Sequence, residues 1–137
     1  APIFLMQAFA RQAPVGSAVV NMLDTQLATP SSRTFSYFCA KAALETATKL
    51  AALELAPDIR VNGVAPGLVL PSGDQTEKTF AERQALTPLG EGLGADDIAN
   101  AVLYLASARH VTGEIIRVDS GQHLVGFSNA DLPWQSG

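Results

Sequence analysis

The sequence predicts an α/β fold in which helices cover both faces of a parallel sheet. Segments with helical periodicity alternate along the chain with short apolar runs rich in β-branched residues. No internal repeat interrupts this alternation. Strands that are separated by helical segments pair in parallel, and their crossover connections place the helices against the sheet.

The first half of the chain supplies two helices and one strand. A helix is expected over residues 2–11, because Pro2 suits a first helical turn. A strand follows at residues 18–22. The alanine- and leucine-rich segment 35–55 is predicted as a long helix that ends ahead of Pro57, because proline interrupts a helix.

The second half supplies two further strands and one helix. A strand is predicted at residues 60–64, and a loop-rich stretch then runs to Gly94. A helix is predicted over residues 96–107, because the acidic pair at its start suits the positive end of a helix dipole. The last strand is predicted at residues 114–118. About three strands and three helices are therefore expected.

Composition narrows the class of protein. A chain of 137 residues with 47% hydrophobic content makes one globular domain, and a net charge of -4 gives no basic field for nucleic acid. No apolar run approaches the roughly 20 residues that a membrane span needs, and no secretory leader is seen, so we expect a soluble, cytoplasmic protein. Cys39 is the only cysteine, which rules out an internal disulfide, and we expect it to fill space in the packing.

Tyr37 and Lys41 form the most informative pair in the chain, and an acid, Asp24, precedes them where a strand ends. Residues at i and i+4 share a helix face, which puts a phenol beside an ammonium. A nearby cation favours the charged form of an acid, so we expect Lys41 to lower the pKa of Tyr37 below its unperturbed value of about 10. Such a phenol exchanges protons near neutral pH. Taken alone, the same pair also occurs on many exposed helix faces.

Two other patterns bear on cofactor and metal binding. Residues 90–95 match the letters of a dinucleotide fingerprint, but the residues before them contain a proline and no β-branched run, whereas a fingerprint follows a strand. We interpret these glycines as a flexible hinge. His110 and His123 lack the partner spacing of a metal site, so no metal is predicted and a surface or tail position is expected for each.

Five motifs recur in a known order and spacing: the Tyr37–Lys41 pair and segments 54–67, 96–99, 111–114 and 118–122. This series resembles the second half of the short-chain dehydrogenase/reductase family, over residues 1 to about 124. The resemblance implies a Rossmann-like doubly wound parallel sheet of which residues 1–137 are the carboxy-terminal half. It also implies a substrate-covering loop at 68–95 and a tail at 125–137. Family members are nearly twice as long, so we expect this piece alone to be inactive.

The resemblance assigns roles to the turn that follows the second predicted strand. Pro66 and Gly67 match the place where the backbone meets a nicotinamide ring, and a glycine would allow that close approach. Val69 falls where a backbone group holds the carboxamide, and Leu68 and Leu70 fall beside the substrate. The implied cofactor is NADPH. NADH stays open, because the selecting residues would precede the first residue of this chain.

Asp24, Tyr37 and Lys41 match the family's catalytic positions. Tyr37 corresponds to the catalytic acid, and Lys41 to the lysine that lowers its pKa and holds the nicotinamide ribose. Most family members carry serine where Asp24 stands, and an ionised carboxylate has no proton to donate. It suits a substrate that presents N–H groups, or it helps to relay a proton. With segments 21–24 and 121–124, this position resembles the pteridine reductases and their dihydropterin-reducing bacterial relatives.

The sequence therefore points to an NADPH-dependent reductase of a pterin, and two other functions stay open. One is a carbonyl or alcohol oxidoreductase of the same family, in which Asp24 merely replaces serine or turns the chain at a strand end. The other is a catalytically silent piece with a structural or assembly role. Helices 2–11 and 35–55 match those that the family pairs across a tetramer interface, so the resemblance implies a homotetramer.

Overall fold

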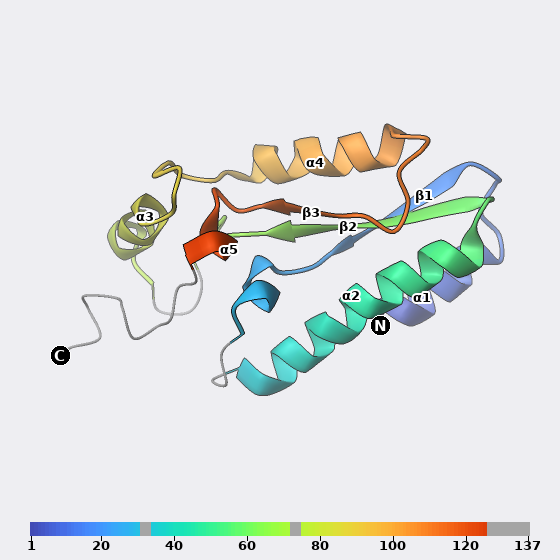
Figure 1. Ribbon diagram of the computed structural model, residues 1–137, viewed down its shortest axis with the longest axis horizontal. Helices are drawn as coiled ribbons and strands as arrows, with labels where there is room; N and C mark the ends of the chain where they lie inside the picture. Colours follow the sequence, from blue (N-terminus) through green and yellow to red (C-terminus); the bar gives the residue numbers. More distant parts are fainter. Residues whose placement is uncertain (31–33, 72–74, 126–137) are drawn as a thin grey trace.

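The computed structural model describes residues 1–30, 34–71 and 75–125 of the chain. These residues form three layers, with a three-stranded parallel sheet between helices on its two faces (Figure 1). The predicted α/β class, with a parallel sheet covered on both faces, is confirmed. Among the described residues, no helix combines the length and the apolar character needed to cross a membrane.

The sheet has the order β1-β2-β3, with β2 in the middle. β1 spans Ser17–Met22, β2 spans Ile59–Pro66 and β3 spans Ile115–Val118. β2 pairs with β1 through its first part and with β3 through its last part. β2 is buried almost continuously, as is usual for a strand that is covered on both faces of a parallel sheet. It extends beyond the predicted segment 60–64 at both ends, because residue 59 pairs with β1 and residues 65–66 pair with β3.

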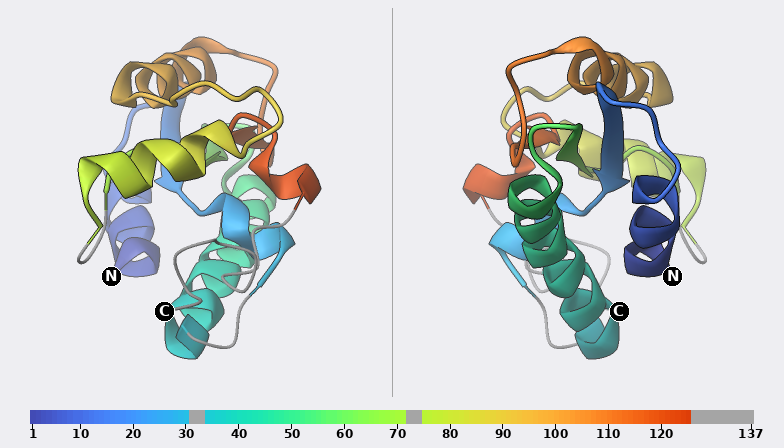
Figure 2. Two further views of the ribbon diagram at one scale, coloured as in Figure 1. Left: turned by 90° about the vertical axis from the view of Figure 1, so that its left-hand side faces the viewer. Right: turned by 90° about the vertical axis from the view of Figure 1, so that its right-hand side faces the viewer.

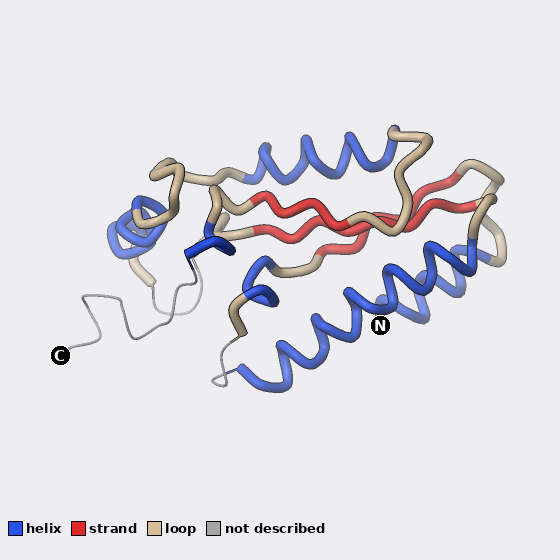
Figure 3. The backbone as a smooth tube through the Cα atoms, viewed as in Figure 1, coloured by secondary structure: helices blue, strands red, loops and turns tan. Residues whose placement is uncertain are grey.

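Two helices cover one face of the sheet. α1 spans Pro2–Ala10, one residue shorter than predicted, and α2 spans Phe35–Leu55, as predicted. The views in Figures 2 and 3 place both helices on the same side of the strands. Their inward side chains form a core with alternate residues of β2, made of Met6, Ala52, Ile59 and Val61.

A single long helix covers the opposite face. α4 spans Ala95–Ser107, and its buried Ile98 and Leu105 pack against Val64 of β2. The helix begins with the predicted acidic turn, in which Asp97 Oδ2 accepts the Gly94 N–H at 2.8 Å. That contact satisfies one backbone donor outside the helix and places negative charge at the positive end of the dipole.

Arg60 of β2 holds the other end of α4. Its Nη1 donates to the carbonyl oxygen of Leu105 at 2.7 Å and to that of Val111 at 3.3 Å, and Nη2 donates to that of Ala106 at 2.7 Å. The last carbonyl groups of a helix have no partner inside it, and a cation there also suits the dipole. Arg60 therefore joins the central strand to the helix above it.

Three short elements are absent from the sequence prediction. α3, Glu77–Ala85, lies inside the segment 68–95 that was expected to be a loop. It contains little apolar periodicity, with Phe80 its only buried residue, and a reciprocal capping box between Thr76 and Thr79 defines its start. A 3-10 turn, η1 (Thr25–Ala28), follows β1, and α5 (Gln122–Val125) follows β3. Residues 126–137 of the predicted tail lie outside the described residues, as do 72–74 of the predicted loop.

Cys39 lies exposed on α2, so the prediction that it fills space in the packing is wrong. The preceding residue, Phe38, takes the inward position and is 7% exposed. Successive residues of a helix point about 100° apart, because each turn contains 3.6 residues. Only one of the two neighbours can therefore face the sheet.

The carboxyl ends of the three strands point to one edge of the sheet, where η1, α3 and α5 also lie (Figure 1). In open parallel sheets, ligands bind outside the carboxyl ends of the strands. Asp24 follows β1 at this edge, and Gly67 follows β2. The fold thus brings segments that are far apart in the sequence to the edge where a site is expected.

Candidate active site

Asp24 stands directly ahead of η1 and caps it. Its backbone is extended, and its Oδ1 accepts the Gln26 N–H at 2.8 Å. This is the strand-end turn that the sequence left open as the simpler role of Asp24. The cap uses only one carboxylate oxygen, so the other is available to a second partner.

Tyr37 is that second partner. Its phenol projects from the first turn of α2, and Oη donates to Asp24 Oδ2 at 2.6 Å. Partial burial, this hydrogen bond and the negative charge of Asp24 all raise the pKa of Tyr37 above its ordinary value. The prediction that Tyr37 has a lowered pKa is therefore wrong for this structure, because the phenol contacts a carboxylate. Tyr37 is a protonated acid at neutral pH here.

Lys41 lies one turn further along α2, as the spacing predicted. Its Nζ donates to the carbonyl oxygen of Met22 at 2.8 Å and lies 5.8 Å from the centre of the Tyr37 ring. The ammonium is thus within cation–π reach of the ring, but it donates its hydrogen bond to the end of β1. Lys41 and Tyr37 are neighbours, and Lys41 also ties α2 to the strand that leads to Asp24.

A cleft of about 650 Å³ opens beside Tyr37. Asp24 and Tyr37 line one part of it, and residues 66–70, the turn after β2, line another. The structure therefore gathers all the sequence-predicted site residues at this cleft except Lys41, which does not line it but lies near the Tyr37 ring. Gln26 and Thr34 also line the cleft, although no sequence pattern singled them out.

Gly67 is required for a reason that the sequence did not indicate. A Cβ at this position would lie 2.8 Å from Cα and Cβ of Asp119 and 2.9 Å from Oε1 of Gln122. The close approach that glycine allows is therefore made to the segment after β3, within the chain itself. Gly67 also donates its N–H to the carbonyl oxygen of Val118 at 2.9 Å, which extends the pairing of β2 with β3.

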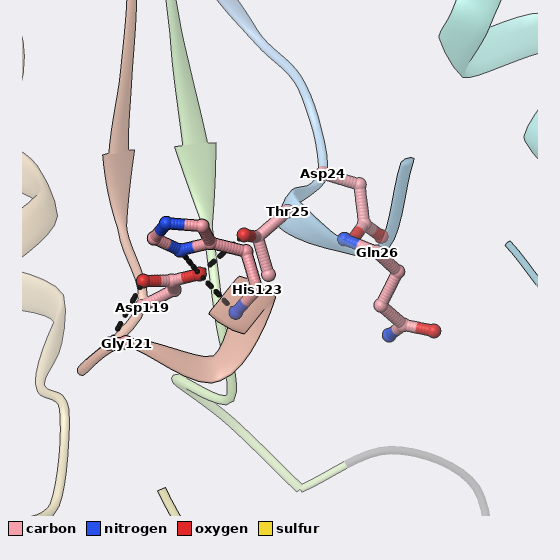
Figure 4. A network of polar contacts seen from close by, with 6 residues as sticks. All are labelled: Asp24, Thr25, Gln26, Asp119, Gly121 and His123. Atoms are coloured by element: carbon pink, nitrogen blue, oxygen red, sulfur yellow. Dashed lines mark hydrogen bonds and ion pairs between the residues drawn. The ribbon is translucent and has the colours of Figure 1, made fainter. Parts of the chain in front are cut away.

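A buried polar cluster behind the cleft was missed by sequence reasoning. Asp119, which follows β3, accepts hydrogen bonds from the Thr25 hydroxyl and from both the backbone and the ring of His123 (Figure 4). His123 lies only partly at the surface, with its side chain 31% exposed, and its ring contacts a buried acid that sequence reasoning did not predict as its partner. Burial would raise the pKa of Asp119, but the hydrogen bonds from Thr25, His123 and Gly121 outweigh it and hold that pKa below its usual value.

The glycines of residues 90–95 follow α3 and a turn, not a strand, so the context of a dinucleotide fingerprint is missing there. Within residues 1–30, 34–71 and 75–125, no group of three or more His, Cys, Asp or Glu side chains is arranged to hold a metal ion.

Comparison with known proteins places this geometry among reductases. The family described as enoyl-(acyl carrier protein) reductase matches residues 1–123. Pteridine reductase 1 of Leishmania tarentolae is 37% identical over 136 residues, which cover 90% of this chain and 47% of that protein. Dihydromonapterin reductase of Klebsiella pneumoniae is 30% identical over 110 residues, covering 79% of this chain and 45% of that protein.

The fold has solved counterparts as well. The crystal structure of FolM alternative dihydrofolate reductase 1 from Brucella canis, complexed with NADP, matches with a TM-score of 0.85 and 34% identity. The match covers 93% of this chain and 52% of that one. The chain therefore spans about half the length of the relatives that it matches.

Proposed function

Because the chain belongs to the short-chain dehydrogenase/reductase family, we propose that it forms the carboxy-terminal, proton-transferring half of an NADPH-dependent reductase whose substrate is a pterin. The observation that carries the proposal is the hydrogen bond from Tyr37 Oη to Asp24 Oδ2, 2.6 Å long, at the edge of a cleft outside the strand ends. A phenol and a carboxylate meet there, and both face a space in which a small molecule fits.

The residues of the cleft fit one end of a nicotinamide cofactor. The turn 66–70 lines the same cleft as Tyr37, so a ring held against that turn would share the cleft with the phenol. When bound, the cofactor would supply a hydride. The phosphate groups of a dinucleotide need a glycine-rich turn between a strand and a helix, and no such turn occurs among the described residues. We propose that the preceding half of a complete reductase supplies it.

Tyr37 acts as the proton donor in this proposal. The phenol is protonated at neutral pH, as an ordinary tyrosine is, and this is the state that a donor needs. Proton transfer to a C=N nitrogen, as hydride reaches the carbon, leaves a phenolate beside the Asp24 carboxylate. Two like charges at this distance repel each other, so the phenolate is driven to recover a proton. Lys41, near the same ring, offsets part of that negative charge.

Asp24 accounts for the choice of a pterin. A carboxylate accepts hydrogen bonds and donates none, so it suits a heterocycle that presents N–H groups better than it suits a simple carbonyl oxygen. Asp24 and Tyr37 line the same cleft and are already in contact, so a ring bound by one would reach the other. The names of two relatives, a pteridine reductase and a dihydromonapterin reductase, support the same substrate class.

A carbonyl or alcohol reductase of the same family is the second candidate, and one observation favours it. Asp24 Oδ1 is already occupied by the Gln26 N–H, as in an ordinary strand-end turn. If capping is the whole role of Asp24, a serine in its place would cap η1 as well, because both residue types are good N-caps. The pterin reductase therefore predicts a large loss of activity in Asp24→Ser, and the carbonyl reductase predicts a small one.

Steady-state assays separate these candidates. In the full-length protein with NADPH, we expect Asp24→Ser to reduce kcat/KM for a dihydropterin by about 100-fold, as expected when a bound polar group loses its partner. The same change should affect reduction of a simple ketone far less. Asp58→Ser is the matched control, because Asp58 is exposed in the turn before β2, at the opposite end of the sheet. A small effect on both reactions would support the carbonyl reductase instead.

We also propose that α1 and α2 pair with a second copy of the protein in a homotetramer. Large apolar side chains of both helices stay exposed, with Phe4 at 75%, Leu5 at 68% and Leu53 at 80%. An apolar groove of about 540 Å³ lies between the two helices. Exposed apolar surface of this kind typically marks an interface. Leu53→Glu should lower the sedimentation mass of the full-length protein, and an unchanged mass would contradict the proposal.

A further inference from the structure

Asp119 is a buried acid whose four hydrogen bonds all converge from nearby segments. It is 4% exposed and directly follows β3. Oδ1 accepts the Gly121 N–H at 3.0 Å, and Oδ2 accepts the His123 N–H at 3.0 Å and the His123 ring at 2.8 Å, besides the Thr25 hydroxyl. A buried carboxylate with this many donors has one orientation, because any rotation leaves a buried group unpaired.

The hydrogen bond from the Thr25 hydroxyl connects Asp119 to the segment that carries Asp24, a residue of the cleft. Thr25 is 1% exposed and lies 94 residues from Asp119 in the sequence, whereas the other donors belong to the turn after Asp119 itself. Figure 4 shows Thr25 facing Asp119 while Asp24, one residue earlier, points the other way toward Gln26. A link between the end of β3 and the residue next to Asp24 is therefore built into the core.

The turn that contains Thr25 has little stability of its own. η1 is four residues long, and 3-10 turns of this length have few and poorly aligned internal hydrogen bonds. On the strand side, Leu23 donates to the carbonyl oxygen of Val64 at 2.7 Å, which holds the chain just before Asp24. Directly after Asp24, the buried hydrogen bond from the Thr25 hydroxyl to Asp119 holds the chain in place.

We propose that Asp119 is a positioning residue for Asp24: by accepting the Thr25 hydroxyl it holds η1 so that the Asp24 carboxylate faces Tyr37 and the cleft. This inference rests on the proposed function, because it assigns Asp119 to the site in which Tyr37 donates a proton. Asp119 does not itself line that cleft. Its effect passes through one hydrogen bond and one peptide unit to the carboxylate.

The test compares the loss of one buried hydroxyl near the site with the loss of another far from it. Thr25→Val removes the donor to Asp119 but keeps the side-chain shape, and Thr25→Ser keeps the donor. Thr48→Val is the control, because Thr48 is also fully buried and its hydroxyl bonds to Asn21 and the Leu44 carbonyl on α2. All variants are made in the full-length protein, and kcat with a dihydropterin is measured beside amide hydrogen exchange at Gln26 and Leu27.

We expect Thr25→Val to lower kcat by about tenfold to 100-fold, the effect of a small displacement of a reacting group, and to speed exchange at the two η1 amides. Thr25→Ser should retain most of kcat, and Thr48→Val should change neither quantity. Wild-type exchange together with wild-type kcat in Thr25→Val would overturn the inference, as would equal losses of kcat in Thr25→Val and Thr48→Val. If the wild-type protein turns over no dihydropterin while Thr25→Val still speeds η1 exchange, the proposed function fails and the positioning of Asp24 by Asp119 stands.

Discussion

Replacement of Gly67 by alanine is the sharpest structural perturbation that this fold offers. The added methyl group would lie 2.8 Å from Cα and Cβ of Asp119 and 2.9 Å from Oε1 of Gln122. Carbon atoms in contact prefer separations of about 3.5–4.0 Å, so the methyl group must push the segment after β3 away. Because one of the contacted atoms is a backbone α-carbon, no change of side-chain rotamer relieves the overlap.

The expected cost is about 1–3 kcal/mol of unfolding free energy, as is usual for a methyl group forced into a packed site. A displaced Asp119 also loses the Thr25 hydroxyl, so we expect kcat to fall together with stability. Urea denaturation of the full-length protein measures the first effect, and steady-state turnover measures the second. Gly92→Ala is the matched control, because its Cβ would meet only side-chain atoms of Gln84, with Oε1 at 3.1 Å, and no backbone atom within 3.9 Å.

The control variant should change the unfolding free energy by less than about 0.5 kcal/mol, as exposed substitutions usually do. Gly67→Ala and Gly92→Ala with equal stability would refute the packing argument, since the first methyl group meets a backbone α-carbon at 2.8 Å and the second meets only a side chain, at 3.1 Å. A stable Gly67→Ala protein with normal turnover would also show that Asp119 can move without consequence for the cleft.

Three further outcomes follow from the same structure. Arg60→Ala should lower the free energy of unfolding, measured by urea denaturation, by about 2 kcal/mol, because it removes a guanidinium bound to three carbonyl oxygens at the end of α4. Arg60→Lys should retain only part of that free energy, since an ammonium lacks the fork geometry of a guanidinium. The folded-state pKa of Asp119 is lowered, so its contribution to stability is present above the unfolded pKa of about 3.9 and is lost as pH falls through the folded pKa. The stability gap between wild type and Asp119→Asn should therefore narrow in acid, and a constant gap would contradict this. In a Tyr104→Phe background, Tyr37 is the remaining tyrosine of the chain, and its ionisation can be followed by ultraviolet titration. Asp24→Asn should then lower the pKa of Tyr37, because the negative charge of Asp24, which raises that pKa, is gone.

The elements with strong local signals were predictable from the sequence. The helix over residues 35–55 was placed correctly because its sequence is rich in Ala and Leu and contains no Gly or Pro before Pro57. α3 was missed because it buries only Phe80 and depends on a cap formed by two threonines, which a pattern of apolar residues does not register. η1 and α5 were missed because each is a single turn that follows a strand.

The candidate site divides in the same way. Asp24 and Tyr37 could be selected from spacing and family resemblance, and the fold brings them into contact. The direction in which the Tyr37 pKa shifts could not be predicted from the sequence. The helix spacing indicates Lys41 as a neighbour, but it does not show that the Asp24 carboxylate, ahead of η1, approaches the phenol. The Thr25–Asp119 bond joins residues 94 positions apart, and neither residue has a local pattern that signals it.

The most direct test of the central claim is a comparison of wild type with Tyr37→Phe in the full-length protein, with NADPH and a dihydropterin. The substitution removes only the hydroxyl group that contacts Asp24 at 2.6 Å. If Tyr37 donates the proton, turnover is abolished while the affinity for NADPH, measured by fluorescence titration, stays largely intact. Unchanged turnover in Tyr37→Phe would contradict the account.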